Sequence, residues 1–396
     1  MAPLADLLLL LAALPVLGAA GYLLVLTLAS RRGPAPVPGP PERRFDIVVP
    51  AHDEEEGIAS TVQSLLALDY PPEKRRILVV ADNCTDATAE RARAAGASVL
   101  VRDDPSRRGK GYALALAFER SLAEGTADAI VVVDADTTVS ANLLAAFAAR
   151  LAAGAPAIQA VYGVRNPDAS WRTRLLAIAF SLVGTVRGLG RERLRCSAGL
   201  HGNGMCFAAG VLRSVPHAAF SLVEDLEYTI RLGRAGHRVH FVAEAEVRAD
   251  MAAGGEAARI QRRRWEGGRR EIARRHALPL VWRGLAAPDR VLLDLGLDLA
   301  VPPLATLGAA AAGGTAAALL AAWSLGTSLA AVGIWGGSLA ALLAYLMRGW
   351  WLSGTGLRGL GVLLYAPVYL AWKLGLALGR DRSQGAWLRT PRERQP

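Results

Sequence analysis

The stretch VVVDADTTVS occupies Val131–Ser140, and the fold assignment starts there. Ile130 to Val133 form a continuous apolar run, which predicts a short strand buried on both faces of a sheet. Two carboxylates, Asp134 and Asp136, follow with one residue between them. Such a pair repels itself unless positive charge lies close to both acids. The stretch therefore predicts a cation, or hydrogen-bond donors, at the end of a buried strand.

The chain around this stretch alternates short apolar runs with helical patterns. The predicted strands are Phe45–Val49, Ile77–Ala81, Ser98–Val101 and Ile130–Val133, and the predicted helices are Gly57–Leu68, Asp86–Ala95, Gly111–Glu124 and Ala141–Ala152. This alternation predicts an α/β fold, a mostly parallel sheet with helices on both faces. Ligands of such sheets bind beyond the carboxyl ends of the strands. The polar residues at those ends are His52, Asp53, Glu54, Asp82, Asn83, Asp134 and Asp136.

Two nucleotide-binding motifs that such sheets often carry are absent from the sequence. No G-x-G-x-x-G follows the first predicted strand, which argues against a dinucleotide-dependent oxidoreductase. The segment RRGKGYA, residues 107–113, lacks the first glycine of a P-loop and the Ser or Thr that should follow Lys110.

The apolar residues are concentrated at the two ends of the chain. Of the 396 residues, 52% are hydrophobic. Leu4–Leu28 is long enough for a transmembrane helix, and no Lys or Arg precedes it as in a signal peptide. Because Arg31 and Arg32 follow this run, the positive-inside rule places the N-terminus outside and the following domain in the cytoplasm.

Three further apolar runs follow the central domain. The first begins between Val291 and Ala300 and ends near Ala322, and the second is Leu325–Met347. The third, Leu357–Leu378, has basic segments at both ends, so we expect an interfacial helix, with a fourth span as the alternative. The expected parts are a transmembrane helix (1–30), a Pro-rich linker (31–44), a globular catalytic domain (45–287), two transmembrane helices (288–347) and an interfacial or fourth transmembrane helix with a basic cytoplasmic tail (348–396). This predicts a multi-pass protein of the cell (inner or plasma) membrane.

Charge and cysteine content limit the partners. The net charge of +10 fits anionic lipid or phosphorylated substrates, although codon bias explains the excess of arginine equally well. No nucleic-acid partner is expected. Cys84, Cys196 and Cys206 form no C-x-x-C pair, which favours a reduced compartment over a disulfide framework.

Three groups of residues indicate chemistry. In an extended segment Asp134 and Asp136 point the same way, so they suit Mg²⁺ or Mn²⁺ carrying a diphosphate. Glu224 and Asp225 fall in the first turn of a predicted helix, where an acid is a candidate base or simply favourable for a helix start. Gln261, Arg264 and Trp265 share one helix face, suited to phosphate oxygens and a sugar ring or, alternatively, to a solvated basic helix.

The order of motifs resembles a known family. VVPAHDEEEGI, VVADNCTDAT, RRGKGYALA, VVVDADT, GNGMCFAAGVL, VEDLEYTIRLGRAGHRVHF and QRRRW follow one another between about residues 45 and 270. The chain is similar in this respect to the inverting family 2 glycosyltransferases of GT-A fold, and most so to the membrane-bound cellulose, chitin and hyaluronan synthase branch.

The resemblance implies roles for individual residues. Pro50, Ala51 and Glu54 would lie near the nucleotide, Asp82 would accept a hydrogen bond from its base, and Lys110 would lie near the nucleotide pocket. Asp134 and Asp136 would hold the metal and the nucleotide sugar, with Asp136 the more direct ligand. Asp225 would be the general base. Gln261, Arg264 and Trp265 match the Q-x-x-R-W motif of the catalytic site, in which Arg264 would steady the leaving diphosphate and Trp265 would pack near the acceptor.

The segment Cys196–Phe207 would shape the acceptor end of the cleft. Gly202 and Asn203 are its candidate acceptor residues, and His201 is either an acceptor contact or a structural turn residue.

The implied function is metal-dependent transfer of a sugar, with inversion, from a nucleotide-diphosphate sugar to a lipid or growing glycan. A UDP-sugar is the first choice of donor, and membrane lipids are expected partners. Asp53 stands where the family often has Asn, Val223 where the polymerising enzymes usually have Thr, and the spans are few. A processive polysaccharide synthase therefore stays an alternative, as does a catalytically inactive membrane scaffold. A nucleotidyltransferase would need a Gly-rich, Arg-containing loop where the chain has PAHDEEEG.

Overall fold

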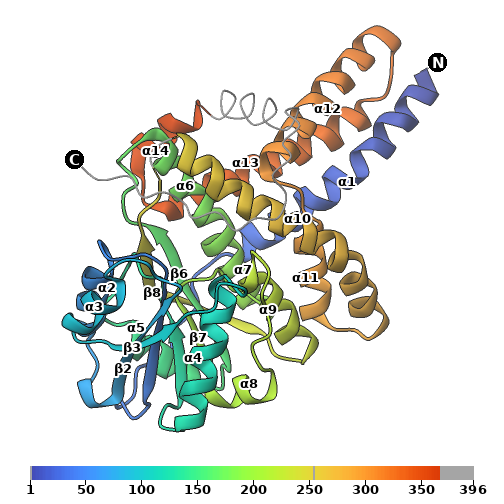
Figure 1. The fold of residues 1–396 in the computed structure, drawn as a ribbon. Helices are drawn as coiled ribbons and strands as arrows, with labels where there is room; N and C mark the ends of the chain where they lie inside the picture. Colours follow the sequence, from blue (N-terminus) through green and yellow to red (C-terminus); the bar gives the residue numbers. More distant parts are fainter. Residues whose placement is uncertain (1, 253–254, 366–396) are drawn as a thin grey trace.

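The middle part of the chain is built on one eight-stranded sheet, whose arrangement is drawn in Figure 1. The computed structural model describes residues 2–252 and 255–365, with backbone alone for residues 255–264. The strand order is β3-β2-β1-β4-β7-β6-β8-β5. The strands are β1 (Phe45–Ala51), β2 (Arg75–Asp82), β3 (Ser98–Arg102), β4 (Ala129–Val132), β5 (Thr137–Val139), β6 (Ala157–Val164), β7 (Met205–Ala208) and β8 (Val239–Ala249).

The two halves of this sheet differ in strand direction. β3, β2, β1 and β4 are mutually parallel. β7 then runs antiparallel to both β4 and β6, while β6 and β8 are parallel and β5 closes the far edge antiparallel to β8. The predicted α/β class with helices on both faces is thus confirmed, and the uninterrupted parallel pairing that the β-α alternation indicates ends at β4, with β6 and β8 the one parallel pair in the second half.

Helices cover both faces because alternate residues of each central strand point in opposite directions. Ile47 and Val49 pack beneath one helix layer, and Val48 packs beneath the other. The first layer contains α2 (Ile58–Leu66), α3 (Thr88–Ala94) and α5 (Leu143–Ala152), and the second contains α4 (Lys110–Glu124), α7 (Arg187–Arg193), α8 (Ala209–Ser214) and α9 (Glu224–Arg234). Burial on both faces explains why these strands are continuously apolar.

All eight elements predicted between Phe45 and Ala152 are present, with ends that differ by two residues or fewer. β6, β7 and β8 lie outside that prediction. They cross to one another over long connections, and so no regular β-α repeat marks them in the sequence. A short 3-10 helix, Pro72–Lys74, precedes β2.

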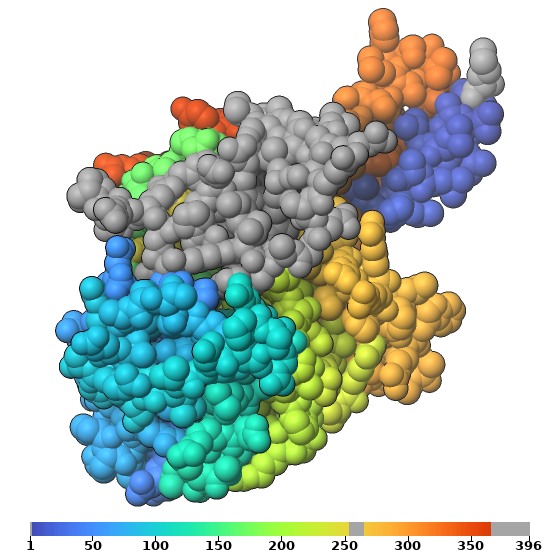
Figure 2. Space-filling model, viewed as in Figure 1, coloured from blue at the N-terminus to red at the C-terminus, as the bar shows by residue number. Residues whose placement is uncertain are grey.

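Long apolar helices stand clear of the sheet domain at one corner of the molecule (Figures 1 and 2). They are α1 (Ala2–Ala29), α12 (Leu304–Leu325) and α13 (Leu329–Ser353). All three are long and apolar enough to cross a membrane, and a fourth such segment is Trp171–Arg193. α12 and α13 meet closely, since a Cβ on Gly314 would lie 2.2 Å from the Trp335 ring.

The fourth segment differs from the other three in its burial. It comprises α6 (Trp171–Phe180), a π-helical turn (Ser181–Val186) and α7, and 67% of its most apolar window is buried inside the protein, against 17–33% for the others. Gly190 contacts the backbone of Leu26 in α1, and Gly349 of α13 contacts Leu182. The segment therefore joins the sheet domain to the projecting helices.

The apolar run after the catalytic domain begins later than the sequence predicts. α11 (Arg290–Ala300) is a separate helix that packs against α10 (Gly255–Ala286), and α12 begins only at Leu304. α11 carries Asp294 and Asp298, which are buried and paired with Arg191 and Arg187 of α7. Ion pairs of this kind hold α11 inside the protein, since a buried carboxylate needs its partner.

The last predicted helix is described only in part. α14 (Gly356–Leu363) covers its beginning. The remainder of Leu357–Leu378, and the basic tail beyond it, lie outside the described residues.

Candidate active site

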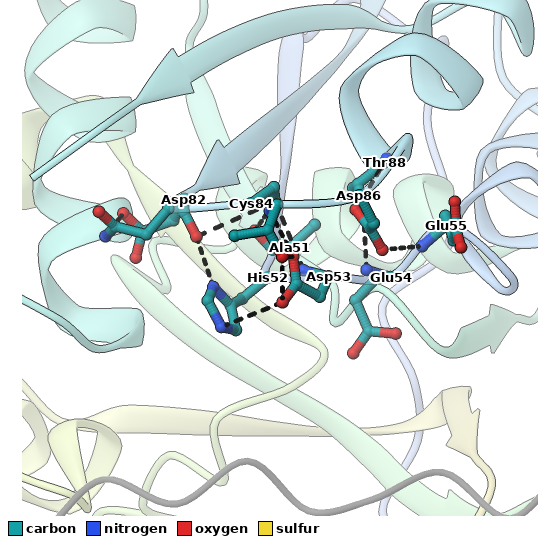
Figure 3. A network of polar contacts seen from close by, with 11 residues as sticks. Ala51, His52, Asp53, Glu54, Glu55, Asp82, Cys84, Asp86 and Thr88 are labelled. Atoms are coloured by element: carbon teal, nitrogen blue, oxygen red, sulfur yellow. Dashed lines mark hydrogen bonds and ion pairs between the residues drawn. The ribbon is translucent and has the colours of Figure 1, made fainter. Parts of the chain in front are cut away.

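A pocket of about 140 Å³ opens at the carboxyl ends of β1 and β2, next to the start of α4. Its lining residues are Pro50, Ala51, His52, Asp82, Asn83, Arg108, Gly109, Lys110 and Ala113. Four of the residues that the sequence assigned to the nucleotide, Pro50, Ala51, Asp82 and Lys110, therefore lie around one cavity. Glu54 is not part of its lining, and its side chain points away from Asp86 (Figure 3).

The loops that follow β1 and β2 are tied together beneath this pocket (Figure 3). His52 Nδ1 lies 2.7 Å from the Asp82 carbonyl oxygen, and the Cys84 thiol donates to the Ala51 carbonyl at 3.5 Å. The Thr85 N–H donates to the Asp53 carboxylate at 2.6 Å. Asp53 and Asn83 both have φ of 51°, in the left-handed region that Asp and Asn tolerate better than most residues. These contacts fix the shape of the pocket.

Asp82 lies at the wall of the pocket beside an arginine. Arg102 donates to its carboxylate at 2.6 Å, and Asn83 donates at 2.9 Å. Burial raises the pKa of Asp82, and the pairing with Arg102 offsets only part of that effect. Both donors bind Oδ1, and a carboxylate oxygen is a hydrogen-bond acceptor suited to an N–H of a flat heterocycle.

Asp53, Cys84 and Asp86 form a group that sequence patterns did not indicate. One possible ligand atom from each residue lies within 4.8 Å of the other two. Among the described residues, this is the cluster of Asp, Glu, His or Cys side chains that are close enough together to share a metal ion. The Asp86 carboxylate accepts the N–H groups of Thr88 at 2.9 Å and Glu55 at 3.2 Å. The acids of this group thus already bind the backbone of the loops that carry them.

A second group of acids surrounds the Lys110 ammonium. Lys110 Nζ donates to the Asp134 carboxylate and, at 2.6 Å, to the Gly202 carbonyl. Glu224 Oε1 lies 3.9 Å from the same nitrogen. Asp225 lies on the other side of Gly202, where a Cβ would be 3.4 Å from Asp225 Oδ2 and 3.5 Å from Lys110 Nζ. Three carboxylates from β4 and α9 therefore converge on one cation.

Burial controls the protonation of this group. Glu224 and Asp225 border a small apolar pocket that also contains Leu114 and Tyr228. Burial raises the pKa of Glu224 to about 7, against the opposing effect of Lys110. It also raises the pKa of Asp225, while the Leu226 N–H and Lys110 lower it. Perturbed acids beside a pocket are the usual mark of a catalytic centre.

The D-x-D segment is not an extension of the strand, which corrects the geometry expected for it. β4 ends at Val132, and the chain turns at Ala135 and Asp136 before β5 begins. The alternation rule for extended chain therefore does not apply to Asp134 and Asp136. Asp134 contacts Lys110, whereas Asp136 Oδ1 accepts from Thr137 Oγ1 at 3.4 Å. The pKa of Arg165 is raised mainly by its hydrogen bond to Asp250, with a smaller contribution from the Asp136 charge.

Asn203 holds this turn from behind. It is 0% exposed; its Oδ1 accepts the Asp134 N–H at 3.1 Å, and its Nδ2 donates to Thr137 Oγ1 at 2.8 Å. Its side chain therefore holds the turn that carries the two acids, and the acceptor role expected from the sequence stays a prediction. Gly202 has φ of 78°, a backbone conformation that favours glycine, and a Cβ there would be in van der Waals contact with Asp225 Oδ2 and Lys110 Nζ.

Gln159 of β6, which sequence reasoning missed, supports the same loop. It is wholly buried, donates to the Asn203 carbonyl at 2.7 Å and accepts the His201 N–H at 2.9 Å. Burial lowers the pKa of His201 to about 4, so the imidazole is neutral, and it lies under Gly184 of the π-helical turn. A Gln within an otherwise apolar strand could have indicated a buried side chain with hydrogen-bond partners.

α10 passes next to the start of α9. A Cβ on Gly268 would lie 2.8 Å from Val223, the residue before Glu224. Trp265 is half-buried, with its ring 5.9 Å from that of Phe180. α10 is continuous through Gly267 and Gly268, so Gln261, Arg264 and Trp265 occupy one helix. The side chains of Gln261 and Arg264 lie outside the described part of the chain.

The donors at the acid group fit a hard divalent cation. A cation is already present there: the Lys110 ammonium donates both to the Asp134 carboxylate and to the Gly202 carbonyl oxygen. Carboxylate and carbonyl oxygens are the ligands that Mg²⁺ and Mn²⁺ prefer. The group thus combines a cation position, acids of raised pKa and an adjoining pocket, which suits displacement of an anionic leaving group by a hydroxyl.

Known families and proteins provide a comparison for this arrangement. The model described as "Glycosyltransferase like family 2" matches residues 40–268, more than half of the chain. The chain is 26% identical over 209 residues to the probable glycosyltransferase YdaM of Bacillus subtilis, covering 51% of this chain and 49% of that protein. It is 29% identical over 234 residues to beta-monoglucosyldiacylglycerol synthase of Synechocystis sp., covering 56% and 47%. The chain spans about half the length of these relatives.

A solved structure extends the likeness to the fold. The mannosyltransferase PcManGT from Pyrobaculum calidifontis, in complex with GDP-Man and Mn²⁺, superimposes with a TM-score of 0.51 at 18% identity, covering 87% of this chain and 99% of that chain. At this identity the likeness concerns the fold alone.

Proposed function

Because the chain belongs to glycosyltransferase family 2 and has a GT-A-like fold, we propose that it transfers a sugar from a nucleotide-diphosphate sugar to an acceptor hydroxyl with inversion. The observation that carries the proposal is the position of Lys110. This residue lines the pocket at β1 and β2, donates to Asp134 and lies 3.9 Å from Glu224, the neighbour of Asp225. A nucleotide in the pocket would thereby present its diphosphate and sugar to those acids.

The donor fits the pocket in one direction. Its base would lie against Pro50 and Ala51, with Asp82 accepting a hydrogen bond from a ring N–H. Its diphosphate would lie at the start of α4, where Arg108, Lys110 and the first N–H groups of the helix favour negative charge. A UDP-sugar is the first donor to test. A GDP-sugar is the second, because GDP-Man is bound in the mannosyltransferase of similar fold.

The transfer step needs a base on the acceptor side. Asp225 takes the proton of the acceptor hydroxyl, whose oxygen bonds to the anomeric carbon as the bond from that carbon to the diphosphate oxygen breaks. The electron pair leaves with the nucleoside diphosphate, so the anomeric centre inverts. Mg²⁺ or Mn²⁺ held by Asp134 and Asp136 would neutralise charge on the leaving diphosphate. The raised pKa of Asp225 suits a base that must accept this proton.

A lipid acceptor at a membrane surface is part of the proposal. α1, α12 and α13 have the length and hydropathy of spans. On the second half of α10, Leu278, Trp282 and Leu285 recur at helical spacing and are 65%, 65% and 58% exposed. Arg274 and Arg275, one turn earlier, are exposed too. An apolar stripe with adjacent arginines is suited to the headgroup region of an anionic bilayer, and the glycolipid synthase among the relatives supports a lipid acceptor.

The proposal places the catalytic domain on the cytoplasmic side of the cell membrane, with the N-terminus outside. It rests on Arg31 and Arg32 after α1 and on Arg348 near the end of α13.

The test uses the full chain in lipid nanodiscs. UDP-glucose, other UDP-sugars and GDP-mannose are supplied with Mn²⁺ and diacylglycerol-containing lipid, and products are identified by mass spectrometry. The expected result is release of nucleoside diphosphate with one sugar added to lipid. A ladder of products would instead establish processive synthesis. Absence of any metal-dependent nucleoside diphosphate release with every donor would overturn the proposal in favour of an inactive scaffold.

A further inference from the structure

The Lys110 side chain lies between two parts of the site that would each attract its positive charge. It lines the pocket where a donor diphosphate would bind, yet its ammonium lies among Asp134, Glu224 and the Gly202 carbonyl. A diphosphate attracts a cation, and so does a group of carboxylates. One side chain cannot satisfy both at once.

The position of the ammonium also conflicts with a divalent ion. Lys110 Nζ donates directly to the Asp134 oxygen, on the carboxylate proposed to hold the metal. An ion within bonding distance of the same oxygen would face a like charge at very short range, where repulsion is strong. The ammonium must therefore move before Asp134 can bind a divalent cation fully.

We propose that Lys110 is a tethered counter-cation that occupies the metal position of Asp134 until a donor diphosphate draws its ammonium into the nucleotide pocket. The inference rests on the proposed function and adds an order of events to it. Metal binding at Asp134 is weak in the free enzyme and strengthens when a nucleoside diphosphate is present. Asp225 loses the nearby ammonium in the same movement, which makes it a stronger base at the moment when a donor is in place.

The local backbone supports movement of the side chain rather than of the helix. Gly109, before Lys110, has φ of 130°, a conformation that favours glycine. Gly111, after it, is pinned, since a Cβ there would lie 2.1 Å from the Ala219 carbonyl oxygen. The backbone of Lys110 is thus fixed between the two parts of the site. Its flexible four-carbon stem allows the ammonium to turn from one to the other.

Glu224 explains why the free site tolerates such a switch. It is buried, it lies 3.9 Å from Lys110 Nζ, and it stays in place when the ammonium turns. The ammonium satisfies the acid group while no donor is present, which avoids the cost of unpaired buried carboxylates. When the donor arrives, the divalent ion takes over that neutralising role for Asp134.

The experiment measures Mn²⁺ binding, without turnover. Free Mn²⁺ is counted by electron paramagnetic resonance while the full-length protein in nanodiscs is titrated, with and without UDP or GDP. For the natural chain we expect a nucleoside diphosphate to tighten Mn²⁺ binding by about tenfold or more. In Lys110→Met we expect nucleotide-free Mn²⁺ binding to tighten by a similar factor and the dependence on nucleotide to fall to about twofold or less.

Three controls make the outcome specific. Lys74→Met makes the same chemical change in the 3-10 helix before β2 and should leave both affinities unchanged. Lys110→Arg keeps the charge and should retain most of the nucleotide dependence. Lys110→Met combined with Asp134→Asn should lose the tightened site; if it does not, the ion binds elsewhere, for instance at Asp53, Cys84 and Asp86, and the proposal is wrong.

Two failures can be told apart. In the first, the natural chain binds Mn²⁺ more tightly with nucleotide, but Lys110→Met has the same nucleotide-free Mn²⁺ affinity as the natural chain. This result overturns the proposed role of Lys110 as a counter-cation and leaves the glycosyltransferase proposal standing. Absence of nucleoside diphosphate binding in every variant, each shown to be folded by its melting curve, overturns both.

Discussion

Gly268 of α10 lies directly against Val223, with 2.8 Å between the position of a Cβ on Gly268 and Val223 Cγ1. Val223 immediately precedes Glu224 and Asp225 at the start of α9. The helix that carries Trp265 therefore contacts the residue directly before the proposed base. Gly268 allows this close contact, and α10 continues through Gly267 and Gly268.

This contact predicts the effect of a single methyl group. Gly268→Ala should displace Val223 and with it Asp225, lowering kcat by roughly tenfold or more, because small misplacements of catalytic groups are costly. Gly267→Ala, whose Cβ meets nothing within 4 Å, should keep kcat and stabilise α10 by about 0.5–1 kcal/mol. Steady-state kinetics and melting curves of the two variants check this. Equal kcat values for the two variants would show that the contact between Gly268 and Val223 does not position Asp225.

Asn203 should matter for the metal more than for the acceptor. Asn203→Ala removes both bonds that hold the D-x-D turn and leaves buried groups unpaired, at a cost of about 1–3 kcal/mol. We expect weaker Mn²⁺ binding with nucleotide present and an unchanged KM for the acceptor. Asn142→Ala, which loses one bond to Glu244 at the surface, is the control. A raised acceptor KM with normal Mn²⁺ affinity would restore the acceptor role.

Activity should depend on pH through Asp225. The base must be deprotonated, and burial raises its pKa, so kcat/KM should fall on the acid side at a pH above the ordinary Asp value of about 3.9. Burial raises the pKa of Glu224 to about 7, so this neighbour is already protonated where Asp225 titrates, and Glu224→Gln should leave the fall at the same pH. A pH profile of kcat/KM for the two proteins tests it. An acid limb that is displaced in Glu224→Gln would mean that Glu224, and not Asp225, controls the titration.

Asp225→Asn should separate binding from chemistry. It keeps the shape of the side chain and removes its basicity, so we expect transfer to fall by about 10²-fold or more and UDP affinity to stay within about twofold. Calorimetric titration with UDP and a product assay check the two parts. Near-normal turnover would exclude Asp225 as the base.

The exposed stripe on α10 should act only at a bilayer. Leu278→Glu and Leu285→Glu place carboxylates where we propose anionic headgroups, so activity in nanodiscs should drop several-fold, by roughly 1 kcal/mol per charge, and should be unchanged in detergent. Leu66→Glu alters a leucine of α2 that is 46% exposed and serves as the control. Equal loss in detergent would point to damage to the fold instead of lost membrane contact.

The first half of the catalytic domain is predictable because its contacts are local. Runs such as Ile77–Ala81 and Ile130–Val133 are apolar throughout, which only a strand covered on both faces requires. The pocket follows too, since Pro50, Asp82 and Lys110 lie at the ends or beginnings of consecutive elements that a parallel arrangement must bring together.

Residue patterns along the chain therefore suffice for the strands, the helices between them, the apolar ends and most of the acids in the site, because each depends on neighbours in sequence. The assembled fold is needed for the rest. Lys110 meets Asp134 and Gly202, Asn203 holds the D-x-D turn, and Asp298 pairs with Arg187 between α11 and α7, all across 24 to 111 residues of chain. No periodicity in the sequence indicates such pairings, since they arise only when elements far apart in sequence pack against one another in the fold.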